Sequence, residues 1–309
     1  MLKKVGFLPS NNKTITMKRN INPKLTTHNP QLFITESFRD AVQGLKIIIP
    51  TEEKAHYLNL LLKVGFNYLD AGSFVSAKTV PQMADTPQVL KKLDLKNTVS
   101  KIMILVVNQK GAEQAVTYEQ IAVLSFPFSV SETFLNLNLK LNMQKAFERA
   151  CFINDLCKKH NKEFFFYLSM GLGNPYGDKW HPDIVMTWME KCRKEGISRF
   201  GISDITGEAD AERITFLFSE LYKEFPALDI SLHLHTDQKS WYDKVKAAWE
   251  TGVRHFDTVL GGIGGCPMTG YELLGNLNTL DVLRFCKDYK LNHHLNEEAL
   301  RSMTDYSFL

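Results

Sequence analysis

The stretch RFGISDITGEADAERITFLFSELYKEFPALDISLHLHT, residues 199–236, contains one complete strand–helix–strand unit. Apolar runs rich in β-forming residues lie at 199–205 and 229–236. Between them, residues 208–225 carry apolar side chains at helical spacing. Strands that are joined through a helix run parallel in the same sheet. The stretch therefore predicts an α/β fold built on a parallel sheet.

The same alternation of strand and helix continues along the chain and gives eight units. Further strands are expected at 32–37, 67–74, 101–107, 120–128, 163–170 and 255–262. Helices are expected at 51–65, capped by Thr51 and ended by Gly65, at 131–160, opened by Ser131 and Glu132, and at 182–196, 239–252 and 271–289. Eight units with almost continuously apolar strands predict a closed (β/α)8 TIM barrel, with a C-terminal helical extension and a polar tail after Gly270.

Composition limits the classes of protein that this chain resembles. The 309 residues are 44% hydrophobic and 23% charged, with a net charge of +3, which excludes a strongly basic nucleic-acid binder and permits an anionic small substrate. No run of 18 apolar residues occurs, so no membrane span is expected. The five cysteines lack the paired spacing of a disulfide framework, which favours a reducing compartment.

The N-terminal segment differs from the rest of the chain. Its lysines and arginine precede the first acidic residue, Glu36. We interpret residues 1–29 as a loosely ordered arm, with a targeting segment as the alternative, and residues 30–309 as a single domain. The expected location is the cytoplasm, or the mitochondrial matrix if the arm is a transit segment.

His233 and His235 are the first candidates for chemistry. Side chains two apart in a strand point to the same face, so the two imidazoles aim at one spot, while Ile230, Leu232 and Leu234 face the other way. The pair is either two core histidines bonded to backbone or half of a metal site, because one metal ion satisfies both imidazoles at once.

Other polar residues fall where TIM barrels place their chemistry, at the carboxyl ends of the strands. Asp40 supplies a hard oxygen for a divalent ion, and Arg39 supplies a cation for a developing oxyanion; the alternative is a surface ion pair. Asn276 is either a fourth ligand or the cap of the last helix. The mixed nitrogen and oxygen donors do not choose between Mg²⁺ and Mn²⁺.

Three further residues at the expected mouth have two interpretations each. Asp70 and Asp204 are either turn formers or carboxylates that orient Arg39 or a histidine, or relay a proton. Cys266 follows the glycines of GGIGGCP, 261–267, and is either a small buried side chain or a thiol on a lid that donates a proton.

Six segments of the sequence together resemble the 3-hydroxy-3-methylglutaryl-CoA lyases, within the wider metal-dependent barrel lyases and Claisen-type synthases. They occur in matching order between about residue 30 and residue 290, and the second and fifth are the most specific. The segments are RDAVQG (39–44), SFVSAKTVPQM (73–83), SMGLGNPYGDK (169–179), HLHTD (233–237), GGIGGCP (261–267) and GNLNT (275–279).

The resemblance implies a role for each matching residue. The metal ligands fall on Asp40, His233, His235 and Asn276, and the cofactor is Mg²⁺ or Mn²⁺. The catalytic residues fall on Arg39, Asp40, Asp204, His233 and Cys266, and the substrate-binding residues on Gln43, Asp70, Ser73 and Lys78. The partners implied are an acyl-CoA substrate and further copies of the chain in a homodimer or higher homo-oligomer, with no nucleic acid or membrane.

The chain also departs from the family pattern. The strand-two glutamate is Asp70, one methylene shorter, and the aspartate after the second histidine is Thr236. Ser37 and Phe38 replace a glycine and a proline, and Met268 replaces an aromatic residue. Ser37, Phe38, Asp70 and Met268 border the expected acyl pocket, so a related 3-hydroxyacyl-CoA is an alternative substrate.

The reaction implied is cleavage of 3-hydroxy-3-methylglutaryl-CoA to acetyl-CoA and acetoacetate, a step of leucine degradation and ketone-body formation. Three alternatives stay open: a lyase for a related 3-hydroxyacyl-CoA, a Claisen-type synthase that condenses acetyl-CoA with an oxo acid, and a silent barrel that acts as a binding module. The short C-terminal segment argues against the synthase, because synthases usually carry an additional regulatory region.

Overall fold

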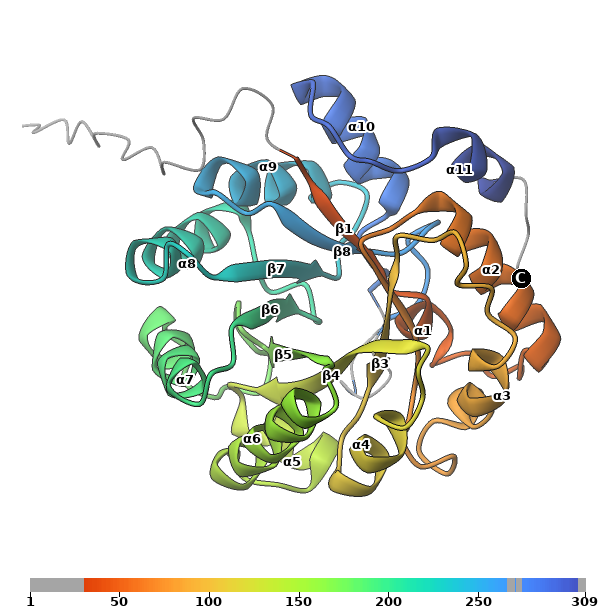
Figure 1. Ribbon diagram of the computed structural model, residues 1–309. Coiled ribbons are helices and arrows are strands. Elements are labelled where there is room, and N and C mark those ends of the chain that lie inside the picture. The colour runs from red at the N-terminus through yellow and green to blue at the C-terminus, as the bar shows by residue number, and fades with distance from the viewer. Residues whose placement is uncertain (1–30, 266–269, 271–273, 305–309) are drawn as a thin grey trace, which may run out of the picture.

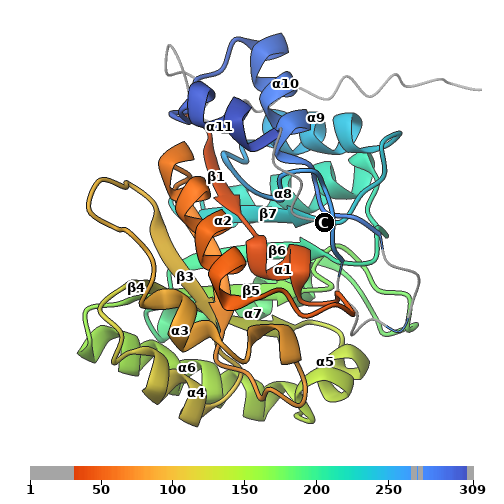
Figure 2. The same cartoon turned by 90° about the vertical axis from the view of Figure 1, so that its right-hand side faces the viewer.

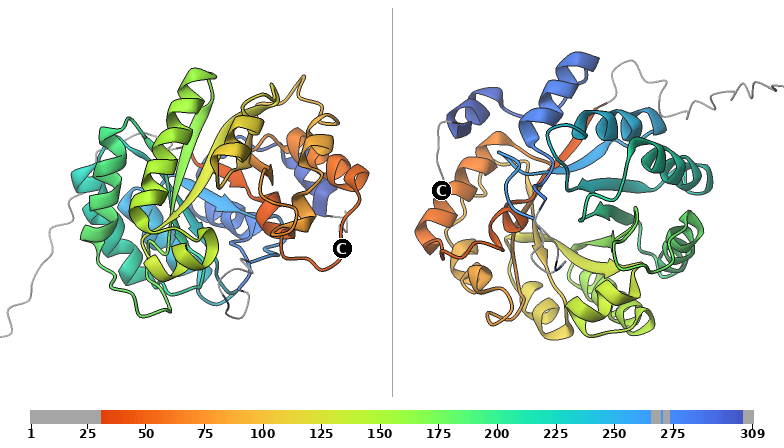
Figure 3. Two further views of the ribbon diagram at one scale, coloured as in Figure 1. Left: turned by 90° about the horizontal axis from the view of Figure 1, so that it is seen from below. Right: turned by 180° about the vertical axis from the view of Figure 1, so that it is seen from behind.

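The computed structural model describes residues 31–265, 270 and 274–304. Eight parallel strands in sequence order form a closed barrel, in which β1 pairs with both β2 and β8 (Figure 1). The helices lie outside the barrel and surround it, as the view from behind also shows (Figure 3). The predicted TIM barrel is confirmed.

The eight strands agree with the predicted runs to within a few residues at each end. They are β1 (Phe33–Glu36), β2 (Tyr68–Ser73), β3 (Lys101–Leu105), β4 (Ile121–Ser129), β5 (Glu163–Ser169), β6 (Arg199–Asp204), β7 (Asp229–Leu234) and β8 (His255–Thr258). The difference in bounds matters most at β7. This strand ends at Leu234, so His235 lies one residue beyond its end and not inside it as predicted.

Both faces of the strands are buried, which explains their continuous apolar character. In β5, Phe165 belongs to a small cluster inside the barrel, whereas Phe164 and Phe166 belong to the large core between barrel and helices. Ile230, Leu232 and Leu234 of β7 also face that outer core, as predicted. The other face of β7 is therefore left to Ser231 and His233, inside the barrel.

Most helices follow the strands at the predicted places. The longer ones are α2 (Thr51–Val64), α5 (Glu132–Leu139), α6 (Met143–Lys159), α7 (Pro182–Lys194), α8 (Ala211–Glu224), α9 (Trp241–Thr251) and α10 (Thr279–Tyr289). Gly65 ends α2 with φ +83°, a conformation that glycine adopts without strain. Asp210 caps α8 by accepting a hydrogen bond from the Arg213 backbone N–H at 2.8 Å. Short helices that we did not predict are α1 (Phe38–Val42), η2 (Pro81–Met83), α3 (Thr86–Leu90) and α4 (Gln109–Ala115).

Two details of the predicted helices 51–65 and 131–160 were wrong. Residues 131–160 form two helices, because Lys140 adopts a left-handed conformation with φ 55° and Asn142 starts α6 by accepting from the Lys145 N–H. Ser131 caps α5 as predicted, accepting from the Phe134 N–H at 3.1 Å. Thr51 does not cap α2: it is the first helical residue, and its hydroxyl donates to Asp85 at 2.6 Å.

The C-terminal extension also differs in detail. The helix expected at 271–289 begins only at Thr279, and the predicted polar tail contains α11 (Glu297–Thr304), which packs beside α2 (Figure 2). Asn278 is the cap of α10, since it accepts from the Leu280 N–H at 3.1 Å. Asn276 is therefore not the cap of this helix, which was one of its two predicted roles. No helix in the described part of the chain is long and apolar enough to cross a membrane.

Candidate metal centre and active site

Asp40, His233 and His235 come together at the carboxyl ends of the strands. Each offers a ligand atom, these atoms lie within 4.8 Å of one another, and all three residues are buried. Asp40 stands in α1, directly after β1, and His235 Nε2 is 3.6 Å from its Oδ2. The alternation of side chains along β7 brings both imidazoles to one side, although His235 lies beyond the strand.

The two imidazoles require a positive charge between them. Their Nε2 atoms are 3.1 Å apart. His235 Nδ1 faces the Leu274 carbonyl at 2.9 Å and His233 Nδ1 faces Asp257 at 3.5 Å, so each Nδ1 is the protonated nitrogen. Two neutral rings would then direct their Nε2 lone pairs at each other, which is repulsive unless a proton or a metal ion lies there.

Without a metal ion, the pKa values of the two histidines indicate which ring carries the additional proton. Burial lowers the pKa of His235 to about 4, which keeps that ring neutral. Burial also lowers the pKa of His233, but the hydrogen bond to Asp257 and the charge of Asp40 outweigh it and leave it raised. A divalent ion would replace that proton.

Asn276 completes the donor set from a different segment. Its Nδ2 donates to Asp40 Oδ2 at 3.0 Å and to the Ile263 carbonyl at 2.9 Å, so its amide oxygen is the atom left for a ligand role. Backbone bonds from Thr236 N to Gly275 O and from Leu277 N to Leu234 O fix this segment against the end of β7. The four predicted ligands are thus neighbours, and their donors fit a divalent metal.

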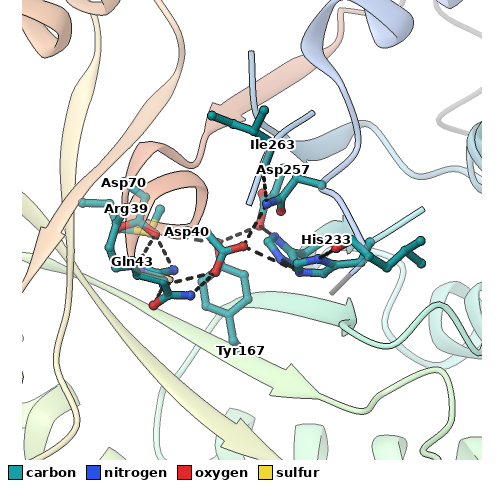
Figure 4. A network of polar contacts seen from close by, with 12 residues as sticks. Arg39, Asp40, Gln43, Asp70, Tyr167, His233, Asp257 and Ile263 are labelled. Atoms are coloured by element: carbon teal, nitrogen blue, oxygen red, sulfur yellow. Dashed lines mark hydrogen bonds and ion pairs between the residues drawn. The ribbon is translucent and has the colours of Figure 1, made fainter. Parts of the chain in front are cut away.

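Arg39 is held rigidly beside the candidate metal ligands. Its Nε and Nη2 contact Asp70 Oδ2 at 2.8 and 2.7 Å, and its Nη1 contacts Gln43 Oε1 at 2.9 Å and Asp40 Oδ1 at 3.3 Å (Figure 4). Burial lowers the pKa of Arg39, but the carboxylates of Asp70 and Asp40 outweigh it and leave it raised. Arg39 is therefore a permanent, oriented cation with most of its geometry already set.

Asp40 remains ionised in these surroundings. Burial alone would raise the pKa of its carboxyl, but Arg39 and the two imidazoles outweigh burial and hold that pKa below its usual value. Gln43 donates to Asp40 Oδ1 at 2.6 Å and fixes the carboxylate from the other side. An ionised carboxylate beside two imidazoles is a suitable anionic ligand for a divalent metal.

Two residues that the sequence did not single out support His233. Asp257 on β8 faces His233 Nδ1, and Tyr167 on β5 donates its hydroxyl to Asp257 Oδ2 at 2.7 Å. A carboxylate behind a metal-binding imidazole fixes its orientation and the position of its proton. The signal available was a charged residue inside a buried strand, in HFDTVLGG, but only the pairing of β7 with β8 brings Asp257 opposite His233.

Glu36, also unrecognised in the sequence, holds both ends of the segment that carries Asn276. Its carboxylate accepts the Leu260 N–H at 2.8 Å and the Thr279 hydroxyl at 2.9 Å. Burial raises the pKa of Glu36 to about 8, more than these two hydrogen bonds lower it. Glu36 therefore links the end of β1 to the start and the end of the loop between β8 and α10.

The remaining predicted site residues lie outside the cluster of candidate metal ligands. Both oxygens of Asp204 accept backbone N–H groups, from Glu208 and Ala209 at 2.9 Å, so it shapes the turn after β6. Asp204, the buried Ser73 and the exposed Lys78 do not line the cavity described next. Their functional roles stay predictions. Cys266 and Met268 lie outside the described residues.

A cavity of about 300 Å³ opens beside this cluster, in the size range of small-molecule sites. Its wall includes the charged and polar side chains of the cluster: Arg39, Asp40, Gln43, Asp70, Tyr167 and His233. Apolar side chains of the β3 and β4 ends and of α5 also line it, together with Arg149 of α6. The cavity can therefore hold a ligand that has both polar and apolar parts beside the candidate metal ligands.

Comparison with known proteins agrees with this site. The HMGL-like family pattern matches residues 30–306. Hydroxymethylglutaryl-CoA lyase YngG of Bacillus subtilis is 29% identical over 264 residues, which cover 85% of this chain and 87% of the relative. The cytoplasmic 3-hydroxy-3-methylglutaryl-CoA lyase of Danio rerio is 30% identical, covering 79% of this chain and 72% of the relative.

Solved structures are similar over the same part of the chain. The HMG-CoA lyase of Bacillus subtilis superposes with a TM-score of 0.83 at 28% identity, covering 89% of this chain and 92% of the other. The HMG-CoA lyase of Acinetobacter baumannii, solved in complex with coenzyme A and 3-methylmalate, gives 0.82 at 28% identity, covering 89% of each chain.

Proposed function

The chain belongs to the HMGL-like family of carbon–carbon lyases, and from that premise we propose that it cleaves 3-hydroxy-3-methylglutaryl-CoA to acetyl-CoA and acetoacetate. The observation that carries the proposal is the convergence of the His233 and His235 lone pairs on a point beside Asp40, Asn276 and Arg39. A coenzyme A-bound relative supports an acyl-CoA substrate. We assign the protein to the cytoplasm, with the mitochondrial matrix as the alternative, because named relatives come from both compartments.

In this proposal Asp40, His233, His235 and Asn276 hold Mg²⁺ or Mn²⁺. A bound divalent ion supplies Lewis acidity, which makes the 3-hydroxyl of the substrate easier to deprotonate. His233 has no lone pair left for a base when Nδ1 donates to Asp257 and Nε2 is a ligand, so the geometry favours its role as ligand. The hydroxyl proton passes instead to a water held by the Asp40 carboxylate.

The carbon–carbon bond breaks as the alkoxide becomes the ketone of acetoacetate. The electron pair moves into the thioester, which becomes an enolate, and the fixed guanidinium of Arg39 stabilises its oxygen. Asp70 and Gln43 keep Arg39 oriented throughout, so no reorganisation is needed when the charge develops. Protonation at carbon then gives acetyl-CoA. One proton leaves the hydroxyl and one is added at carbon, so the reaction releases no net proton.

The donor of that last proton is Cys266 in our proposal. Asp204, the other predicted donor, has both oxygens engaged by backbone N–H groups and does not line the cavity. Tyr167 does line it, with its hydroxyl on Asp257. The donor is identified by comparing Cys266→Ser, Asp204→Asn and Tyr167→Phe for loss of acetyl-CoA formation.

The function is tested with purified, reduced protein and Mg²⁺ or Mn²⁺. We expect acetyl-CoA and acetoacetate from 3-hydroxy-3-methylglutaryl-CoA, and a panel of 3-hydroxyacyl-CoA thioesters is offered beside it. Cleavage of a related thioester alone would keep the reaction and correct the substrate. Cleavage of none would reject the lyase, and condensation of acetyl-CoA with an oxo acid would then identify a synthase. A protein inactive in both directions would be a binding module.

A further inference from the structure

The wall of the cavity contains a second arginine, Arg149, besides Arg39. Among the described residues that line it, Arg39 and Arg149 are the only arginines or lysines. Arg149 lies on α6, and α5 and α4 lie beside that helix at one edge of the barrel (Figures 1 and 2). Arg39 is bonded to Asp70 of β2, whereas Arg149 is bonded to the Val107 carbonyl after β3. Apolar side chains, among them Leu105, Pro127 and Leu135, line the same wall. The cavity thus offers two arginines, on different elements, to one ligand.

The charge of Arg149 is not balanced by the protein that the structure describes. Its Nη1 donates to the Val107 carbonyl at 2.7 Å, and no ion pair joins it to a carboxylate of a described residue. Burial lowers the pKa of Arg149, and no neighbouring carboxylate acts against burial, in contrast to Arg39. The guanidinium stays charged, because its ordinary pKa lies far above neutral pH. Its other four N–H groups have no hydrogen-bond partner among the described residues, and a guanidinium presents them in the fork geometry that suits carboxylate or phosphate.

The substrate class provides anions of the right kind. An acyl-CoA carries phosphate groups on its carrier, and 3-hydroxy-3-methylglutarate carries a carboxylate. A ligand that occupies the cavity with its hydroxyl at the candidate metal ligands has Arg149 on the same wall as a cation for one of these anionic groups. An unbalanced, half-buried cation on a ligand cavity gains most by meeting such a group, since partial burial strengthens the interaction.

We propose that Arg149 is an anion-binding residue that recognises a phosphate or carboxylate oxygen of the bound acyl-CoA. This proposal rests on the proposed function, because the ligand is the substrate of that reaction. Arg149 would set affinity and the choice of substrate, and would take no part in breaking the carbon–carbon bond. Its loss should therefore raise KM and leave kcat nearly unchanged.

The test compares Arg149→Met with wild type on two substrates, 3-hydroxy-3-methylglutaryl-CoA and the matching pantetheine thioester. The pantetheine thioester lacks the phosphates of coenzyme A and keeps the carboxylate of the acyl group. We expect Arg149→Met to raise KM about 10- to 100-fold, as for loss of a charged hydrogen bond. Arg149→Lys, which keeps the charge, should recover part of that loss. If Arg149→Met does not fold, the lysine variant carries the test, with a smaller rise in KM.

Arg213→Met is the matched control. Arg213 is also half-buried and donates Nη1 to a backbone carbonyl, that of Leu172 at 3.0 Å, but it does not line the cavity. A purely structural role for Arg149 would make the two methionine variants alike, with lower stability and unchanged KM.

The outcomes separate the ligand groups. A higher KM for the coenzyme A thioester alone assigns a phosphate to Arg149, and a higher KM for both thioesters assigns the acyl carboxylate. An unchanged KM on both substrates, in folded Arg149 variants of an active enzyme, overturns the anion site and leaves the proposed function intact. Absence of cleavage and of acyl-CoA binding by wild type overturns the proposed function, and the anion site with it.

Discussion

The two ends of the barrel carry similar charged side chains but use them differently. At the carboxyl end, the mouth cluster consists of Arg39, Asp40, Asp70, His233 and His235. At the amino end, the floor cluster consists of the first residues of five strands: Tyr68, Lys101, Glu163, Arg199 and Asp229. The comparison shows what distinguishes a chemical site from a structural one inside the same fold.

In the floor cluster the charges satisfy one another. Arg199 contacts Asp229 at 2.9 Å, Glu163 at 3.2 Å and the Tyr68 hydroxyl at 2.5 Å, and Lys101 pairs with Glu163. In the mouth cluster the two imidazole lone pairs converge on a point that only a cation can satisfy. Unsatisfied groups that converge predict a ligand, whereas mutually satisfied groups predict stability.

Arg39→Met should have the largest effect on turnover. In the proposed mechanism the guanidinium acts at the moment the enolate oxygen gains charge, so kcat should fall about 10²–10³-fold at saturating metal and substrate. Circular dichroism and thermal melting establish that the variant is folded. Retention of more than a small part of kcat by the folded variant would place Arg39 outside the mechanism.

Asp257→Asn tests the link between the mouth and the barrel interior. The carboxylate behind His233 Nδ1 orients that ligand, and loss of such a partner costs about 10- to 100-fold in metal affinity. The measurement is the Kd for Mn²⁺ by titration calorimetry. Asp229→Asn, the same change in the floor cluster, should leave the Kd unchanged, and an equal loss in both variants would remove the distinction between the clusters.

Glu36 lies at the mouth end of β1, but both of its carboxyl oxygens are hydrogen-bonded within the protein. It therefore tests whether an ionisable residue at the mouth is structural when its hydrogen bonds are satisfied. Burial raises its pKa from 4.5 to about 8, so between these pH values the folded protein holds a proton that the unfolded chain has released. Stability should therefore fall as pH rises from about 5 to 8, by at most about 1.4 kcal/mol per pH unit.

Glu36→Gln, which stays neutral, should remove this part of the slope in urea unfolding measured from pH 5 to 8. If wild type and Glu36→Gln show the same pH dependence, Glu36 titrates near its ordinary value and does not behave as a buried structural group.

Arg199→Met should have the smallest effect. Its partners in the floor cluster are partly exposed, so the loss is about 1 kcal/mol, or a few degrees in Tm. Acyl-CoA cleavage and Mn²⁺ affinity should stay at wild-type values. A fall in kcat without loss of folded protein would show that the floor contributes to the chemistry.

The sequence predicts the features that depend on local pattern. Alternation along 229–236 is sufficient to place both imidazoles on one side, because the period of two is a property of the strand itself. The eight strands are also predicted locally, because each is a short apolar run rich in β-forming residues. Capping residues are less certain: Ser131 caps its helix, but the Thr51 hydroxyl is taken by Asp85, 34 residues away.

The features that were missed depend on contacts between distant segments. The apolar period of 131–160 continues through Lys140, so nothing in the pattern marks the break that its left-handed backbone makes. Asp257 and Tyr167 acquire meaning only from strand register, and Glu36 only from Leu260 and Thr279, more than 200 residues later. The unbalanced charge of Arg149 likewise appears only once the cavity is formed.

The most direct test of the account is a Mn²⁺ titration that follows free Mn²⁺ by electron paramagnetic resonance. Wild type and Arg199→Met should each bind about one ion per chain, because the proposed ligands Asp40, His233, His235 and Asn276 are intact in both. The double variant His233→Ala/His235→Ala, shown to be folded, should bind none at the same concentrations. Equal Mn²⁺ binding by the double variant and wild type would contradict the metal centre and the mechanism built on it.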